Sequence, residues 1–188
     1  MASQNVALDS PAVVVNRLPL WLAVAVTVVF SLPFGLWLGK FNFTLWCSFI
    51  VWAEYFALGA KPQVIPTILK SFGYSALITG VSLAIIPFFA FLPSLVTPND
   101  LAIAVALFIG VAFMVYSMGW SRAFQEGSLP FFNGISMALG VYFSGHFPHV
   151  GPDATLPIVA ALWALAMAAF GVVLGMITIA AQLPSSRR

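Results

Sequence analysis

The residues of this sequence that could do chemistry are few, and Glu54 is the most unusual of them. It lies in the stretch FIVWAEYFALG, where every other residue is uncharged. A charged side chain costs about 2.5–3.5 kcal/mol at the centre of a bilayer and less near its edge. A cationic partner can offset that cost, or the carboxylate can take up a proton. We therefore consider four roles for Glu54: contact with a solute, exchange of protons, a structural ion pair, and snorkelling to the interface.

Four other side chains are candidates for the same path. Trp52 and Tyr55 are close to Glu54 in the chain, and each joins an apolar ring to a polar tip that could form a wall. Asn42 and Asn133 each stand where a predicted helix begins, so each either lines a vestibule or caps its helix. For the ion-pair role, the candidate partners of Glu54 are Lys61, Lys70 and Arg122.

Asn133 belongs to a stretch rich in glycine and proline, QEGSLPFFNG. Gly127, Pro130 and Gly134 would permit an irregular backbone, which occurs at membrane depth only where it lines a cavity. The alternative is an ordinary loop followed by a helix that has proline in its first turn.

No metal, cofactor or catalytic group is predicted. His146, His149 and Asp153 could bind zinc in principle, but Pro148 and Pro152 break any helix that would align them. The sequence contains no nucleophile motif, phosphate-binding loop or pair of intramembrane carboxylates, so we expect a protein that is not an enzyme. A net charge of +2 without a basic stripe gives no indication of nucleic-acid binding.

The composition indicates whether water or lipid surrounds the helices that position these residues. Hydrophobic residues make up 62% of the 188 residues and charged residues only 6%, against about 25% charged residues in soluble domains. Uncharged runs are long, with 29 residues between Lys70 and Asp100 and 33 between Asp153 and Arg187. A helix needs about 20 apolar residues to cross a bilayer. The sequence therefore predicts an all-α integral membrane protein that has the lipid bilayer as its main partner.

Six transmembrane helices are predicted from the apolar runs. Their expected ranges are Leu18–Leu38, Phe43–Leu58, Thr67–Phe91, Leu101–Ser117, Pro130–Phe147 and Leu156–Ala181. They form one six-span domain, 18–181, between an N-terminal tail of residues 1–17 and a C-terminal tail of residues 182–188. Pro33 and Pro87 lie inside predicted spans and should kink them.

The positive residues predict the orientation. With six spans, one side of the membrane receives both tails and the second and fourth connections, which contain six Lys and Arg residues. The other side receives only Lys40. Because positively charged loops stay in the cytoplasm, both termini should be cytoplasmic.

The two halves of the chain show a weak internal similarity. A shift of 91 residues places Asn42 on Asn133, Pro66 on Pro157 and Gly80 on Gly171. Chance matches are common in so apolar a sequence, so coincidence is the alternative. Because each half contains three spans, the second half would enter the membrane from the side opposite to the first. A true repeat would therefore be an inverted repeat, the type that many transporters build around a midplane site.

Small residues at four-residue spacing predict close packing between helices. The pairs are Gly80 with Ala84 and Gly171 with Gly175. They suit packing within one chain and packing between copies equally well. Six helices leave little protein to surround a wide path, so a homo-oligomer whose copies each enclose a narrow path is favoured over a monomer.

Two stretches resemble a known family, domain of unknown function family 1097. Its A-x-Y-F-A pattern is matched by Ala53, Tyr55, Phe56 and Ala57. Its later pattern, similar to P-x-x-F-x-G, is matched in part by Pro130 and Gly134, because Asn133 stands where an aromatic residue is expected. The resemblance covers most of the chain from the second span onward. It implies a small six-span protein of the bacterial inner membrane and implies no activity.

Together these features favour a small-solute channel or secondary transporter. The path would run between the second and fifth spans, with Glu54 on one side and Asn133 on the other. The alternative is a non-transporting structural or assembly subunit of a larger membrane complex, which would have a closed core and a defined partner.

Overall fold

The structure, a computed structural model, describes residues 18–182. Within that range all the regular secondary structure is helical, which confirms the all-α prediction. The two predicted tails lie outside the described residues, except for Gln182, which is the last residue of the last helix. The basic residues of the tails therefore have no described position.

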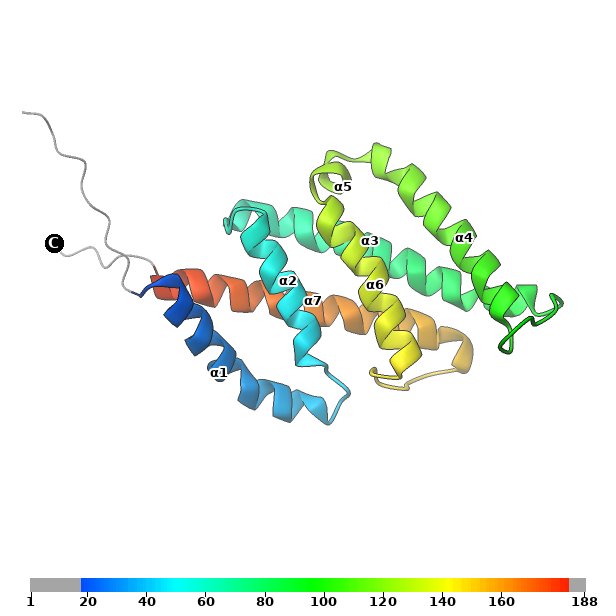
Figure 1. The fold of residues 1–188 in the computed structure, drawn as a ribbon, viewed down its shortest axis with the longest axis horizontal. Helices are drawn as coiled ribbons and strands as arrows, with labels where there is room; N and C mark the ends of the chain where they lie inside the picture. Colours follow the sequence, from blue (N-terminus) through cyan, green and yellow to red (C-terminus); the bar gives the residue numbers. More distant parts are fainter. Residues whose placement is uncertain (1–17, 183–188) are drawn as a thin grey trace, which may run out of the picture.

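Seven α-helices follow one another along the chain (Figure 1). They are α1 (Leu20–Gly39), α2 (Leu45–Ala57), α3 (Ile65–Ala84), α4 (Asp100–Ser117), α5 (Arg122–Glu126), α6 (Ser128–Ser144) and α7 (Leu156–Gln182). Short 3-10 turns lie at Pro62–Val64, Ile86–Phe89, Met118–Trp120 and Asp153–Thr155. With the turns that extend them, α1, α3, α4 and α7 are long and apolar enough to cross a membrane. With 13 and 17 residues, α2 and α6 are shorter than that.

A proline accounts for the largest difference between a predicted and an observed helix end. The third helix was expected to reach Phe91, but α3 ends at Ala84 and a 3-10 turn containing Pro87 follows. Pro87 has no N–H to donate and its ring would clash with the preceding turn, so it ends the helix instead of kinking it. Pro33 lies inside α1, which bends along its length in Figure 1. In α6, Pro130 occupies the first turn of a helix that begins at Ser128.

The two long helices α3 and α7 pack side by side through the middle of the molecule. Figure 1 shows α2 and α6 crossing them, while α1 and α4 lie at opposite flanks. The principal contacts are those of α2 with α7 and of α6 with α3. Each of the two short helices therefore packs mainly on a helix from the other half of the chain.

Glycines permit the close approach of α7 to its neighbours. A Cβ atom at Gly171 would collide with the backbone carbonyl of Ser48 in α2, and one at Gly175 would collide with the ring of Tyr55. A Cβ atom at Gly80 of α3 would lie 2.9 Å from the carbonyl oxygen of Pro157. These glycines thus serve packing inside the chain, whereas the fourth predicted packing residue, Ala84, is half-buried at the end of α3.

A stripe of small residues with hydroxyl groups along α3 forms the surface that contacts α4 and α6. Its members are all buried and comprise Ser71, Ser75, Thr79 and Ser82. Most of these hydroxyls donate to carbonyl oxygens one turn earlier in α3, which satisfies them without a partner helix. Ser75 lies against Gly134 of α6 and Ser82 against Gly110 of α4, so small residues meet on both sides of each contact.

The loop before α4 is held by one carboxylate. Asp100 accepts hydrogen bonds from the backbone N–H groups of Leu95, Val96 and Thr97, with distances between 2.7 and 3.2 Å. We expect Asp100→Ala to release this loop, because three N–H groups lose their acceptor. Faster amide hydrogen exchange over residues 94–100 would show the release, and Asp153→Ala, which alters an exposed acid in another loop, is the control. Unchanged exchange in Asp100→Ala would contradict the role given to this carboxylate.

Candidate functional site

The candidate site lies where α2 meets α6. The Asn133 side chain donates a hydrogen bond from Nδ2 to Oε1 of Glu54, over a distance of 2.5 Å. Glu54 is only 2% exposed, although it is the only charged residue in α2. Two residues that were expected on opposite sides of one path, 79 residues apart in the chain, therefore form a direct contact.

Helix geometry explains why Glu54 points to α6. Ser48 and Tyr55 are two turns apart on the side of α2 that touches Gly171 and Gly175 of α7. Successive residues of a helix are rotated by about 100°, since one turn takes 3.6 residues. Glu54, one position before Tyr55, is therefore turned away from α7 and reaches Asn133.

The second oxygen of Glu54 has no partner in the described part of the chain. Oε2 is buried and makes no hydrogen bond there, and the same holds for Ser48 Oγ and Trp52 Nε1, all on α2. A buried polar atom without a hydrogen bond typically costs 1–3 kcal/mol. Such a cost is a common mark of a functional site, because selection for stability alone would remove it.

No cation approaches Glu54 among residues 18–182. Lys61 and Lys70 are exposed, and Arg122 pairs with Glu126 at 3.7 Å on the surface. The structure therefore contradicts one of the roles considered for Glu54, an ion pair with one of these three residues. The long stems of lysine and arginine allow the charged groups to stay at the surface.

A groove of about 430 Å³ follows the seam between α2 and α6. Its polar lining comes mostly from one stripe of α6, formed by Asn133, Ser136 and Ser144, with His146 beyond the end of the helix. Thr44, just before α2, lies at the same end as His146. Asn133 borders the groove and also contacts Glu54, whereas Glu54 does not line it. Asn133 thus separates the open groove from the buried carboxyl group.

Sequence analysis missed the two serines of this stripe. Ser136 and Ser144 follow Asn133 by three and eleven residues, with Gly140 between them, so all four share one face of α6. That spacing was visible in the sequence. Serines are common in membrane helices, however, and the sequence does not show which neighbouring helix this stripe faces.

Asn42 lies away from Glu54, at the opposite end of α2. It occupies a turn with φ of 62°, a left-handed conformation that asparagine tolerates better than most residues. Its Nδ2 donates to the carbonyl oxygen of Phe147 at 3.1 Å, and its own carbonyl oxygen accepts from Trp163 Nε1 at 3.2 Å. Asn42 therefore ties the turn before α2 to the loop before α7. Asn42 does not line the groove beside Glu54, although it borders another cavity, of about 480 Å³, together with Thr44 and His146.

Trp52 and Tyr55 do not line the groove either. Trp52 is 5% exposed and borders a separate cavity of about 200 Å³ between α1 and α2. Tyr55 is 1% exposed and packs against Gly175 of α7. Both rings thus form part of the packing of α2 against its neighbours, not a wall beside Glu54.

In the glycine- and proline-rich stretch before Asn133, Gly127 forms a turn between α5 and α6, whereas Pro130 and Gly134 lie in regular helix. α6 begins at Ser128, so Asn133 lies in its second turn and does not open the helix. Asn42, by contrast, lies in the turn before α2. The shift of 91 residues that aligned these two asparagines therefore does not align the two helices.

Comparison of the chain with protein-family models, with curated proteins and with solved structures found no match. The resemblance to domain of unknown function family 1097 stays a prediction. Function is accordingly inferred from the geometry of α2 and α6.

Proposed function

We propose that this protein is a small-solute channel or secondary transporter of a bacterial inner membrane, and that the solute follows the seam between α2 and α6. The observation that carries the proposal is the buried Glu54 carboxyl group, bonded to Asn133 at one end of a groove with a polar stripe. Ionisable groups at membrane depth are rare and commonly mark solute and ion pathways. Glu54 would bind a donor group of the solute or exchange protons.

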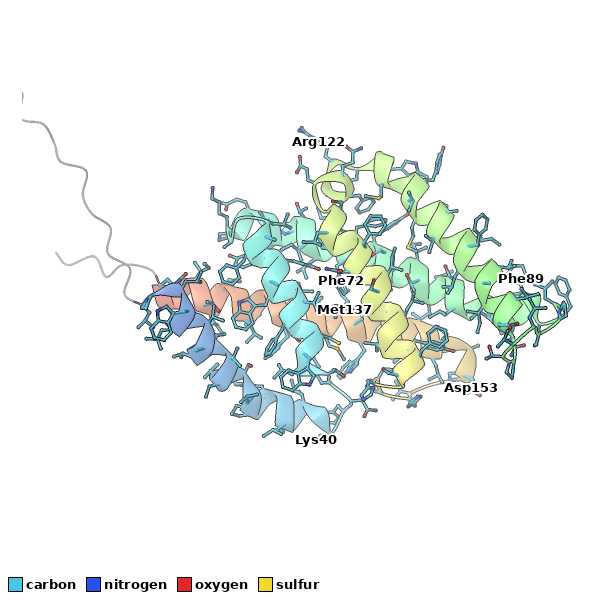
Figure 2. The ribbon with its side chains drawn as sticks, in the orientation of Figure 1. Lys40, Phe72, Phe89, Arg122, Met137 and Asp153 are labelled. Carbon is cyan, nitrogen blue, oxygen red and sulfur yellow. The ribbon has the colours of Figure 1, made fainter. Side chains whose placement is uncertain are left out.

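The placement of charges supports six spans with both termini in the cytoplasm. In Figure 2, Arg122 lies at one edge of the molecule, while Lys40 and Asp153 lie at the opposite edge. The connections between α2 and α3 and between α4 and α6 share the edge of Arg122 in Figure 1. Under the positive-inside rule that edge faces the cytoplasm. Because they are short, α2 and α6 would cross with help from the turns at their ends.

The packing pattern supports an inverted repeat at the level of whole helices. The second helix of each half, α2 or α6, packs on the third helix of the other half, α7 or α3. The first helices follow the same rule, since α1 packs on α7 and α4 on α3. In transporters that are built from inverted repeats, the substrate site lies at the interface between the two repeats.

A flux screen in proteoliposomes tests the proposal. Small neutral and charged solutes would be offered to the wild type, to Glu54→Gln and to Glu126→Gln, which alters an exposed carboxylate that pairs with Arg122. We expect at least one solute to enter with the wild type and Glu126→Gln. With Glu54→Gln its rate should fall roughly tenfold or more, equivalent to about 1.4 kcal/mol. Equal rates for all three proteins would remove Glu54 from the mechanism.

A second candidate function, a non-transporting assembly subunit, is favoured by the outer face of α6. Ser136, Gly140 and Ser144 are exposed, and a Cβ atom at Gly140 would meet no other atom within 4 Å. Small residues at four-residue spacing on a membrane helix admit a second helix at close range. This function predicts no solute flux and co-purification with a defined partner, which Gly140→Leu would abolish. A partner that is a second copy of the chain would instead indicate a homo-oligomer.

A further inference from the structure

We propose that the ligand of Glu54 is a proton, and that proton binding at this carboxyl group is coupled to solute movement along the groove. The coupling rests on the proposed function, whereas proton binding by itself does not. Glu54 would alternate between a neutral acid and a carboxylate, with the released proton passing to water in the groove.

The helices packed around α2 offer Glu54 no countercharge. Within their bounds, α1 and α7 contain no titratable residue. The titratable residues of α3 are Lys70, which is exposed, and Tyr74, whose hydroxyl donates to Ser117 of α4. The one in α6 is Tyr142, which stacks on Phe147 at the far end of that helix.

The remaining titratable residues of α2 do not compensate Glu54 either. Cys47 is two turns away and lines the groove, and Tyr55 is turned toward Gly175 of α7. Neither carries a positive charge in any protonation state. A proton would make Glu54 electrically neutral without a cationic side chain, and it would bind to the buried Oε2 atom.

The donor set also argues against a metal cation. Hard divalent cations take six or more oxygen ligands. The described contacts of Glu54 supply one carboxyl group and one amide, and the amide presents its N–H to Oε1. A proton needs a single oxygen atom, and Oε2 is buried and without a partner among residues 18–182.

Direct contact with a solute is disfavoured by the position of Asn133. This side chain lies between the groove and Glu54, and Glu54 is absent from the groove lining. A solute in the groove would therefore touch Asn133, while a proton could pass to the carboxyl group behind it. Because a carboxylate accepts a stronger hydrogen bond than a neutral acid, loss of the proton would hold the Asn133 amide more firmly and change the groove. Asn133 is thus a positioning residue.

Infrared spectroscopy of the purified protein in detergent tests proton binding without any solute. The wild type should show a carboxylic-acid C=O band that disappears as the pH rises, and Glu126→Gln should keep it. Glu54→Gln should lack this band, and Glu54→Asp should shift it to another frequency and pH midpoint. If Glu54→Gln does not fold, the shift in Glu54→Asp decides. A band unchanged by both substitutions would overturn the proposal.

Coupling is tested in proteoliposomes with an imposed pH gradient. Reversal of the gradient should reverse the direction of solute accumulation in the wild type, and the residual flux of Glu54→Gln should ignore the gradient. Solute flux that is indifferent to the gradient in the wild type would refute coupling while leaving transport intact. A titrating band that is lost in Glu54→Gln, found together with no flux of any solute, would refute transport while leaving the proton site intact.

Discussion

Gly171→Ala is expected to destabilise the protein by about 1–3 kcal/mol, the usual cost of an extra methyl group in a close-packed contact. The new Cβ atom would collide with the carbonyl oxygen of Ser48 and would lie 3.1 Å from the backbone nitrogen of Trp52. Both are backbone atoms of α2, which cannot rotate aside as a side chain can. The whole of α2 would have to move off α7, and Glu54 would move with it.

Gly140→Ala is the matched control for this substitution. Gly140 is also a glycine inside a helix, but a Cβ atom there would meet no other atom within 4 Å. Alanine favours helix over glycine by up to about 1 kcal/mol, so this variant should be as stable as the wild type or slightly more stable. Unfolding in detergent, followed by circular dichroism, measures both. Equal stability of Gly171→Ala and Gly140→Ala would mean that α2 and α7 are not in the close contact described.

Asn133→Leu is expected to cost about 1–3 kcal/mol, because it leaves both oxygens of Glu54 buried without a donor. Leucine has the same branching and the same number of side-chain heavy atoms as asparagine but is bulkier, so the substitution would leave no cavity. Glu54→Leu should cost less than Asn133→Leu, since it removes the buried Oε2 that has no partner within the described chain. A larger loss of stability in Asn133→Leu than in Glu54→Leu is the result that would identify Glu54 as the member of the pair with an unsatisfied oxygen.

The double variant Glu54→Leu/Asn133→Leu completes the cycle. Replacement of both members of a buried polar pair by apolar residues is often close to neutral, so the double variant should recover most of the stability that Asn133→Leu loses. The same detergent unfolding experiment measures all four proteins. Additive losses in the double variant would show that the Glu54–Asn133 contact contributes no coupling energy.

Much of the helix order could be predicted from the sequence. Long uncharged runs are separated by short stretches with charged residues, glycine and proline, which leave few alternative positions for the helices. The fourth helix was expected at Leu101–Ser117 and is observed at Asp100–Ser117. The end of α3 was missed because Pro87 was interpreted as a kink. A proline within an apolar run can bend a helix or end it, and neighbouring helices decide which. The sequence alone does not show which helices pack beside α3.

The members of the candidate site could be predicted, but not their contacts. Glu54 and Asn133 stood out because each is polar in an apolar surrounding. Their contact depends on how α2 and α6 are rotated about their axes, which is set by Gly171 and Gly134 at contacts with two other helices. The same missing information led to the wrong expectation for Lys61 and Lys70.

The packing of α1 sets a condition on how this protein is made. α1 lies mainly against α7, where Thr178 Oγ1 donates to Thr27 Oγ1 at 3.0 Å, and it has little contact with α2, the next helix of the chain. Synthesis proceeds from the N-terminus, so α1 is released from the ribosome long before α7 exists. In a bilayer α1 would remain without its main partner until then, which is possible because the backbone hydrogen bonds of a helix are internal. Translation of α7 is then the event that closes the bundle.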